Sequence, residues 1–521
     1  MMRNLLLATI VAALPFAAQA QTANIAVGGA VTTLDPHFYN NAPNDMISTY
    51  IFDNLTDRDA NTQPVPSLAM SWRVIAPTVW ELSLRPGVTW HDGQPFTADD
   101  VAFSLARIPH VPNSVSGFAG LVRAITKVEI VDPLTIRLHT EAPHPLLITE
   151  LGTVAIVSRH IGETATTEDY NSGRAAIGTG PFRLQSYRPG DRAEFVRNDA
   201  WWGGAQHWAR VNYRFVPNPA ARTAALLSGD VDMIDQVPTG DLARLCASPS
   251  VSVFEKTGGR MLYLSMNYSR KGTPPYATAN DGQKLAANPF QDVRVRRAMS
   301  ISINRVALAR QLMEGTATPS GQWLPPGAFG YNEAVGVPAY DPAAAKKLLA
   351  EAGYPEGFHL TLHSPNDRYQ NDAATAQAVA QMWSRIGVQT QVEAMPWSVF
   401  SARSFRQDFD MRLIGWGNGT GEASYALVNI MATYDAARGL GSSNSGRYSN
   451  PALDALSERA QETLDDAQRR ALLEQAAKLA MDDVAFIPLY QLSNYWATRK
   501  GLAYTPRIDE ATRAVYLRPA E

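Results

Sequence analysis

The stretch of this chain whose residue types best suit the holding of a small molecule is MRLIGWGNGTGEASY, residues 411–425. Residues 411–414 have the apolar character of a strand end, and a glycine-rich turn follows. Glycine has no Cβ, so backbone amides and carbonyls in such a turn can approach a bound molecule closely. The turn also carries one aromatic ring and three polar side chains, those of Trp416, Asn418, Thr420 and Glu422. The residue types alone fit either a ligand-binding loop or an ordinary flexible loop.

Patterns typical of covalent or metal chemistry are missing from the sequence. It contains no H-E-x-x-H, C-x-x-C, P-loop or G-x-S-x-G pattern. His359 and His363 are four residues apart, but HLTLH alternates as a half-exposed strand does, which favours a structural role over a metal site. The segment GSSNSG, residues 441–446, has the composition of an ordinary loop. We therefore expect no catalytic residue, metal or cofactor, and an exported hydrolase is the main competing class.

The elements that must position these loops are well marked. Residues 80–104 read WELSLRPGVTWHDGQPFTADDVAFS, in which apolar and polar residues first alternate as in a half-buried strand. Val88–Trp90 are expected to resume that strand, and Gly93 lies in a turn because it accepts positive φ. Thr97 is the expected N-cap of a helix, and the two aspartates that follow lie near the positive end of its dipole. This segment predicts a β-turn-β-α unit without a catalytic group.

Strands and helices alternate along the rest of the chain, which predicts a mixed α/β protein. A strand pair is expected at 180–198 around the turn Pro189-Gly190-Asp191. Helices are expected in 220–229, 341–353, 450–461 and 466–483 and from Val293 onward, several of them with Asn or Asp as N-cap, Pro at the first position or Gly at the end. The polar segment 268–291, rich in Gly, Pro and Asn, reads as a loop near a domain junction.

The N-terminal residues and the composition point to export. Residues 1–20 combine Arg3, a short apolar run and the A-x-A site Ala18-Gln19-Ala20, as a cleavable signal peptide does. The one cysteine, Cys246, is far from that site, so we expect neither a lipid anchor nor an intramolecular disulfide. The formal net charge is −3 without a basic stripe, which argues against nucleic-acid binding. A periplasmic protein is expected.

The segment 80–104 closely resembles the signature region of family 5 extracytoplasmic solute-binding proteins, the receptors of dipeptide, oligopeptide and nickel ABC importers. Further similar segments follow in the order in which the family has them: TTLDPH (32–37), IFDNL (51–55), PSLAMSW (66–72), GTGPF (178–182), RNDAWWGG (197–204), ALLSGDVDMI (225–234), DVRVRRAMSISINR (292–305), YDPAAAKKLLAEAGYP (340–355) and IGV (386–388). Each segment is weak alone, but the ordered set is specific.

The resemblance implies a type II periplasmic binding protein fold in its large family 5 form, α/β and two-lobed, with the ligand cleft between the lobes. The implied organisation is the signal peptide 1–20, lobe I at 21–267 with an inserted subdomain at roughly 38–175, lobe II at 268–488, and a C-terminal return to lobe I at 489–521. The lobes would close on the ligand around a hinge.

The resemblance also implies where the ligand lies. It places a site in the 416–422 turn and in two more loops. These loops contribute the expected ligand-binding residues Tyr39, Asn40, Asn41, Met46, Arg368 and Tyr369. Arg368 is near the position where dipeptide receptors hold the ligand carboxylate, although an ordinary surface arginine is the alternative. Peptide receptors carry an aspartate three residues after the tryptophan, and this chain has Gly419 there. A peptide ammonium would then lack its carboxylate unless Glu422 reaches back.

The sequence therefore predicts the substrate-binding component of an ABC transporter, which captures a small peptide or similar polar solute by hinge closure and delivers it to the membrane permease. It predicts a monomer that is not an enzyme and needs no cofactor. A binding protein for a non-peptide solute, such as an opine, a glycoside or a metal chelate, is the alternative. An exported hydrolase and a sensory or folding-assistant role are the remaining ones.

Overall fold

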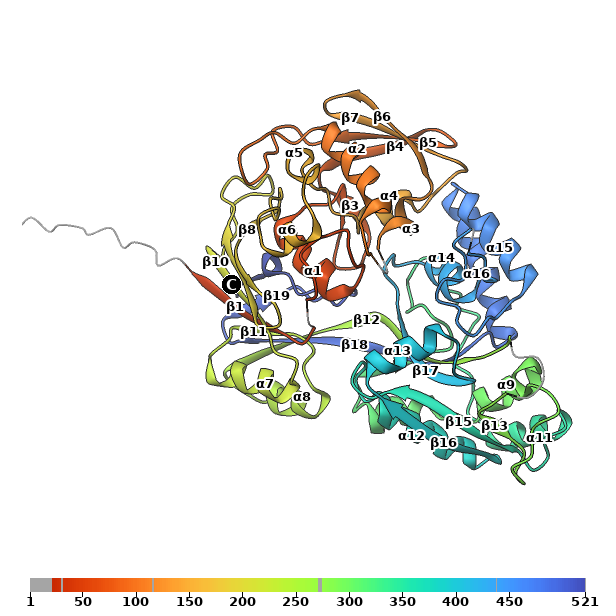
Figure 1. Cartoon of the computed structure of the whole chain (residues 1–521). Coiled ribbons are helices and arrows are strands. Elements are labelled where there is room, and N and C mark those ends of the chain that lie inside the picture. Colours follow the sequence, from red (N-terminus) through yellow and green to blue (C-terminus); the bar gives the residue numbers. More distant parts are fainter. Residues whose placement is uncertain (1–20, 30, 115–116, 270–273, 437, 521) are drawn as a thin grey trace, which may run out of the picture.

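The computed structural model describes residues 21–29, 31–114, 117–269, 274–436 and 438–520. The predicted signal peptide, residues 1–20, lies outside the described residues. The chain forms a mixed α/β structure with two lobes that lie on either side of a central strand pair (Figure 1). The predicted fold class is confirmed.

One twelve-stranded sheet runs through both lobes. Ten of these strands follow one another as hydrogen-bonded neighbours. In order they are β13 (Ala277–Thr278), β15 (Phe358–Pro365), β17 (Met411–Gly417), β12 (Val251–Met266), β18 (Ile487–Arg499), β11 (Met233–Ile234), β1 (Thr22–Val27), β10 (Arg210–Phe215), β9 (Arg192–Arg197) and β8 (Phe182–Arg188). Two more strands pair at its sides, β14 (Ala317–Pro319) with β18 and β16 (Val388–Met395) with β15. Segments far apart in the sequence therefore share one ladder of backbone hydrogen bonds.

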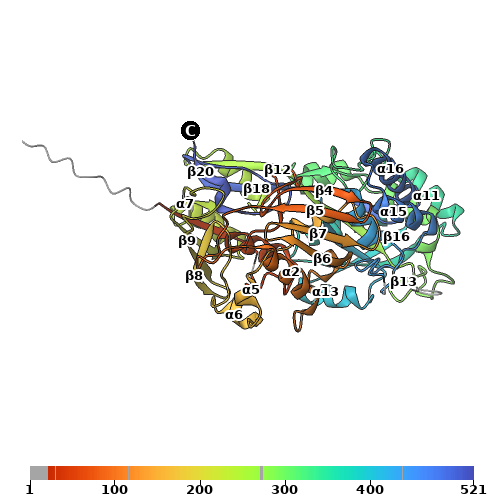
Figure 2. The same ribbon diagram turned by 90° about the horizontal axis from the view of Figure 1, so that it is seen from above.

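Strands β12 and β18 form the antiparallel ribbon that joins the lobes. Their pairing runs from Val251 opposite Arg499 to Leu264 opposite Ile487. At one end the ribbon pairs with β11 of the first lobe, and at the other β12 pairs with β17 of the second lobe. The register of this pairing shifts between Thr257 and Met261, at Gly258 and Gly259. Figures 1 and 2 show both strands passing from one lobe to the other.

A separate four-stranded antiparallel sheet covers the first lobe, in the order β4 (Ala69–Ala76), β5 (Val79–Leu84), β7 (Thr135–Thr140) and β6 (Ile125–Asp132). It buries its own core, which includes Leu82, Trp90 and Leu138. Two short pairs complete the strands, β2 (Thr56–Arg58) with β3 (Pro64–Pro66) and β19 (Leu502–Tyr504) with β20 (Leu517–Pro519).

Helices pack around these sheets. In the first lobe they are α1 (Ala42–Ile51), α2 (Ala98–Arg107), α3 (Ala119–Val122), α4 (Leu147–Leu151), α5 (Arg159–Gly162), α6 (Thr167–Asn171), α7 (Pro219–Ser228) and α8 (Thr239–Cys246). In the second lobe they are α9 (Val293–Ile301), α10 (Arg305–Ala307), α11 (Pro342–Glu351), α12 (Asp372–Ser384), α13 (Trp397–Phe405), α14 (Ala423–Ala426), α15 (Pro451–Glu462) and α16 (Asp466–Asp482). The predicted helices correspond to α7, α9, α11, α15 and α16.

Local signals in the sequence act as expected in most places. Thr97 is the N-cap of α2, and its backbone N–H donates to the Asp100 carboxylate at 2.9 Å in a capping box. Gly229 ends α7 in the left-handed region, with φ of 82°. The expected strand at Val88–Trp90 is wrong: only an isolated bridge between Thr89 and Pro95 forms there, because β5 already has its two neighbours in β4 and β7.

The C-terminal segment after β18 packs on the first lobe. Trp208 donates its indole N–H to the Leu517 carbonyl at 2.7 Å, and Tyr50 donates its hydroxyl to the Thr512 carbonyl at 3.1 Å. The predicted boundaries of the lobes, of the inserted subdomain and of the C-terminal return stay predictions. In the described part of the chain, no helix is both long and apolar enough to cross a membrane.

The ribbon predicts a difference between its two adjacent glycines. A Cβ on Gly258 would lie 2.6 Å from the Leu492 carbonyl oxygen, whereas a Cβ on Gly259 would meet nothing closer than 3.3 Å. We expect Gly258→Ala to lower the stability by about 1–3 kcal/mol, as overpacking does, and Gly259→Ala to lower it far less. Thermal unfolding followed by circular dichroism measures both. Equal melting temperatures for the two variants would contradict this account of the bulge.

Candidate functional site

A cavity of about 420 Å³ lies between the lobes. The first lobe contributes residues of α1, β2 and α3, and the second lobe contributes residues of α13, α14 and the loops around β17. The ribbon forms part of the wall through Gly259, Arg260 and Tyr263, and the segment after β18 closes another part. A cavity bounded on both sides in this way changes shape whenever the lobes move relative to each other.

One face of helix α1 lines the cavity. Ala42, Asp45, Met46 and Thr49 follow the i, i+3, i+4, i+7 spacing of a helical stripe and all contribute to the wall. The opposite side of the helix is buried in the lobe through Asn44, Ile47, Tyr50 and Ile51. The helix begins at the N-cap Asn41, whose side chain accepts from the Asn44 backbone N–H at 3.1 Å. Burial of one face thus fixes which side chains point into the cavity.

Glycines at the end of β17 make room for protein side chains. A Cβ on Gly415 would lie 2.7 Å from the Tyr369 ring, and one on Gly417 would lie 3.2 Å from the Arg260 guanidinium. From the sequence, we expect these glycines to let a ligand approach the backbone. At both positions the glycine instead makes room for a side chain of the protein. Gly419 differs, since nothing lies within 3.8 Å of a Cβ there.

The structure brings most of the predicted site residues together. Eight of them line the cavity: Asn40, Asn41, Met46, Arg368, Tyr369, Trp416, Asn418 and Thr420. Trp416 packs on Tyr425 with ring centroids 5.1 Å apart, which adds a second aromatic surface. Tyr39 is half-buried beside the wall rather than part of it. That these residues contact a ligand stays a prediction.

Glu422 does not line the cavity. Its carboxylate accepts two hydrogen bonds from the Arg469 guanidinium of α16, at 2.9 and 2.7 Å, and both side chains are buried. It also accepts from the Ser424 hydroxyl. Burial raises the pKa of Glu422, and the Arg469 charge opposes that rise. The hypothesis that this carboxylate reaches back toward Gly419 is therefore not supported by its position, because Arg469 already holds it inside the lobe.

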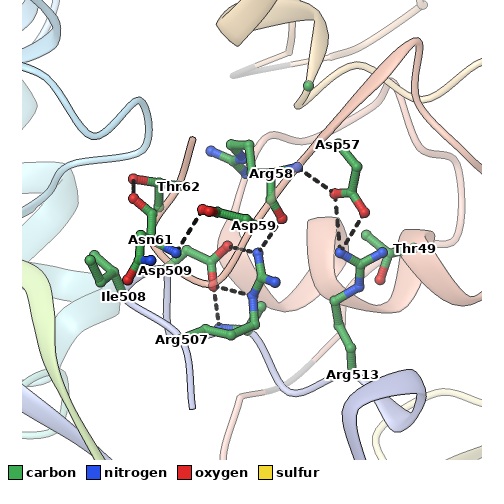
Figure 3. A network of polar contacts seen from close by, with 12 residues as sticks. Thr49, Asp57, Arg58, Asp59, Asn61, Thr62, Arg507, Ile508, Asp509 and Arg513 are labelled. Carbon is green, nitrogen blue, oxygen red and sulfur yellow. Dashed lines mark hydrogen bonds and ion pairs between the residues drawn. The ribbon is translucent and has the colours of Figure 1, made fainter. Parts of the chain in front are cut away.

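The C-terminal segment places a row of charges along the first-lobe side of the cavity (Figure 3). Arg513 binds the Asp57 carboxylate of β2 at 3.0 and 3.1 Å. Arg507 binds Asp509 at 2.8 and 2.6 Å and also donates to the Arg58 carbonyl at 3.0 Å. These pairs hold the segment against β2, so the charges are part of a rigid wall.

A further pair lies on the ribbon. Arg260 of β12 binds Glu510 through its Nε at 2.8 Å and through a second nitrogen at 3.3 Å. Burial lowers the pKa of Arg260, and the charge of Glu510 more than offsets this, so that the pKa is raised overall. Glu150, another lining carboxylate, contacts His144 at 2.7 Å.

Besides Arg58, which donates to a backbone carbonyl, two charged groups in the wall have no ion-pair partner among the described residues. Arg368 lies beside Tyr369 and Trp397, with its guanidinium carbon 5.3 and 5.6 Å from the two ring centroids. Burial and then the neighbouring Arg260 charge lower its pKa. Asp45 of α1 is the other group, and burial raises its pKa to about 8. Arg368 is exposed and Asp45 half-buried in the wall, and neither has a counter-ion among the described residues.

The lobes also contact each other at the edge of the cavity. Arg58 of β2 donates to the Gly419 carbonyl of the second lobe. Gly421 has φ of 74° and lies so close to the Thr62 hydroxyl that no Cβ would fit there. Lys256 reaches Asn61 at 2.7 Å. These contacts describe a conformation in which the lobes are close together.

Sequence reasoning missed the charges of the cavity wall. Arg58 and Glu510 belong to segments without a glycine-rich or aromatic signal, whereas Asp45 directly precedes the predicted Met46 and Arg260 directly follows two glycines. The alternation of Arg, Asp and Glu in RIDEATR, residues 507–513, was the one available hint of a charged surface. Among the described residues, no group of three or more His, Cys, Asp or Glu could hold a metal ion.

Comparisons with known proteins agree with this architecture. Residues 63–437 match the family model of bacterial extracellular solute-binding proteins, family 5 middle. The chain is 27% identical to the dipeptide-binding protein of Escherichia coli, covering 90% of this chain and 88% of that protein. It is 29% identical to the glutathione-binding protein GsiB of Pectobacterium atrosepticum, with the same coverage of 90% and 88%. The solved structure of MoaA from A. tumefaciens R10 in complex with mannopinic acid superposes with a TM-score of 0.79, is 25% identical and covers 96% of this chain and all of that one.

The buried pair of Glu422 and Arg469 predicts a loss of stability when either partner is removed alone. We expect Glu422→Gln to lower the stability by about 3–5 kcal/mol, because it leaves the Arg469 charge buried and unpaired. The double variant Glu422→Gln, Arg469→Met should recover much of that loss. Chemical unfolding of Glu422→Gln, of Arg469→Met and of the double variant measures the coupling free energy between the two side chains. A single variant as stable as the parent chain would show that the pair is not a structural one.

Proposed function

Because the chain belongs to family 5 of the bacterial extracellular solute-binding proteins, we propose that its interlobe cavity captures a small peptide or a similar polar solute. The protein is the solute-binding component of an ABC importer and is not an enzyme, which confirms the role predicted from the sequence. Its fold is the two-lobed fold of periplasmic binding proteins.

The observation that carries the proposal is the uncompensated guanidinium of Arg368 in the cavity. The Arg368 side chain is exposed in the cavity wall and has no counter-ion among the described residues. Its planar fork matches a carboxylate, and such bidentate bonds are strong and directional. The neighbouring rings of Tyr369 and Trp397 both lie beside the guanidinium. A solute carboxylate would therefore complete this part of the wall.

Closure of the lobes is the proposed mechanism of capture. The ligand must contact both walls to favour the closed state, since only a difference in affinity between open and closed forms shifts that equilibrium. Arg368 belongs to the second lobe and the lining face of α1 to the first. A solute that spans the cavity would join them.

Two classes of solute are consistent with the chemistry of the cavity wall. The relatives named for dipeptides and for glutathione favour a small peptide. The contact of Arg58 with the Gly419 carbonyl favours a non-peptide solute, because it brings a cation to the loop where peptide receptors are expected to hold an ammonium. The solved relative with mannopinic acid makes an opine-like compound the specific alternative.

Export and assembly are proposed to follow the family. Residues 1–20 would direct the chain to the periplasm as a cleavable signal peptide, and the mature protein would act as a monomer that delivers its solute to a membrane permease. Native mass spectrometry of protein purified from its own periplasm tests these points together. It would report the processed N-terminus, the oligomeric state and the mass of any solute that stays bound.

Removal of Arg368 gives the direct test of the binding site. We expect Arg368→Ala to weaken binding of the solute identified in the periplasm by about 30-fold or more, because a carboxylate of the solute would be enclosed between the lobes without its charged partner. Isothermal titration calorimetry measures the affinity. Arg385→Ala is the matched control, since Arg385 is exposed at the opposite end of α12. Unchanged affinity in Arg368→Ala would place the solute elsewhere.

A further inference from the structure

The basic and acidic side chains of the cavity wall are equal in number but unequal in their partners. Five are basic and five acidic: Arg58, Arg260, Arg368, Arg507, Arg513, Asp45, Asp57, Glu150, Asp509 and Glu510. Three arginine–carboxylate pairs account for six of them. Glu150 is held by His144, and Arg58 donates to the Gly419 carbonyl. Asp45 and Arg368 are left, one of each sign.

Asp45 is placed to face a ligand. It lies on the lining stripe of α1, and the other side of that helix is buried in the lobe, so the helix cannot turn the carboxylate toward solvent without losing its core contacts. Within the described chain, no donor forms a hydrogen bond or ion pair with the Asp45 side chain. Because the Asp45 side chain lies in a partly desolvated wall and has no protein partner, a cation can bind to it there.

We propose that the Asp45 carboxylate binds a cationic amine of the captured solute while Arg368 binds its carboxylate. The solutes of this protein are then zwitterions held by opposite charges from opposite lobes. This inference rests on the proposed solute-binding function and specifies its substrate class. It also gives the lobes a reason to close, because only a closed cavity brings both charges to one small molecule.

The turn at residues 416–422 is a poor alternative site for that amine. Gly419 has no side chain, its carbonyl is occupied by the guanidinium of Arg58, and Glu422 is held by Arg469. A cation at this turn would meet the positive charge of Arg58 without a carboxylate to balance it. On α1, by contrast, Asp45 offers a free carboxylate on the same cavity.

Among the described residues, Arg58 is the cation whose charge acts on Asp45 and could compete for it. The two side chains are near enough for the Arg58 charge to lower the pKa of Asp45, yet they form no ion pair. Tyr425 of α14 is the other ionisable group whose pKa responds to Asp45. Burial still dominates and raises the pKa of Asp45 to about 8. Arg58 therefore leaves the carboxylate available.

The charge of the amine is tested with Met-Leu and glutathione, each beside its N-acetylated form. Acetylation removes the positive charge and keeps the rest of the molecule. We expect Asp45→Asn to weaken binding of at least one intact probe by about 30-fold or more and to leave its acetylated form unaffected. Asp99→Asn is the control, since Asp99 is likewise an acid in the first turn of a helix, α2, but is exposed.

Proton release on ligand binding distinguishes a direct contact between Asp45 and the ligand from a merely structural role of Asp45. With a pKa of about 8, Asp45 is mostly protonated in the empty cavity at pH 7. Binding of an ammonium requires the ionised form, so binding should release about half a proton or more, and affinity should rise up to about tenfold from pH 6 to pH 7. Calorimetry in buffers of different ionisation enthalpy measures the release, which Asp45→Asn should abolish.

The outcomes separate this inference from the proposed function. Equal binding of an intact probe and its acetylated form, unchanged affinity in Asp45→Asn, or a periplasmic solute without a basic nitrogen would overturn the inference while the solute-binding role stands. Failure to bind either probe would also count against it. If in addition no solute co-purifies with the protein from the periplasm, the proposed solute-binding function is contradicted as well.

Discussion

The pairing of β12 with β18 is the constraint on which the rest of the molecule depends. Strand β18 pairs with β11 of the first lobe and β12 pairs with β17 of the second, so the lobes cannot separate without breaking backbone hydrogen bonds in a shared sheet. The bulge at Gly258 and Gly259 interrupts the pairing where the ribbon passes the cavity. The Gly259 N–H donates to the Ile508 carbonyl and the Gly259 carbonyl accepts from the Asn418 N–H, which places both segments at the wall.

Electrostatics within the cavity follows from that geometry. The chain leaves β18 and returns along the first lobe, so Arg507, Asp509 and Arg513 come to lie against β2. Glu510 reaches across to Arg260 on the ribbon itself. Most charges of the wall thereby neutralise one another, and desolvation is tolerated because each is hydrogen-bonded. Selectivity for a solute then depends on the few groups that the protein leaves without partners.

The sequence predicted the local structure well and the site in part. Capping residues, proline at helix starts and strand alternation identified α2, α7, α9, α11, α15, α16 and the strand pair of β8 and β9, because these signals act over a few residues. The same reasoning was wrong at Val88–Trp90, where the neighbours of β5 decide the pairing. Eight of ten predicted site residues line the cavity, although the glycines beside them serve packing against Tyr369 and Arg260.

By itself, the sequence determined the α/β class, the family and the loops that meet between the lobes. Only the tertiary structure decided which charges are satisfied. Glu422 is neutralised by Arg469, 47 residues away, whereas Asp45 lies on an ordinary helix and has no partner. Ion pairs form between side chains that the fold brings within a few ångströms, regardless of their separation in sequence. The chemistry of the cavity therefore depends on long-range contacts that no local pattern contains.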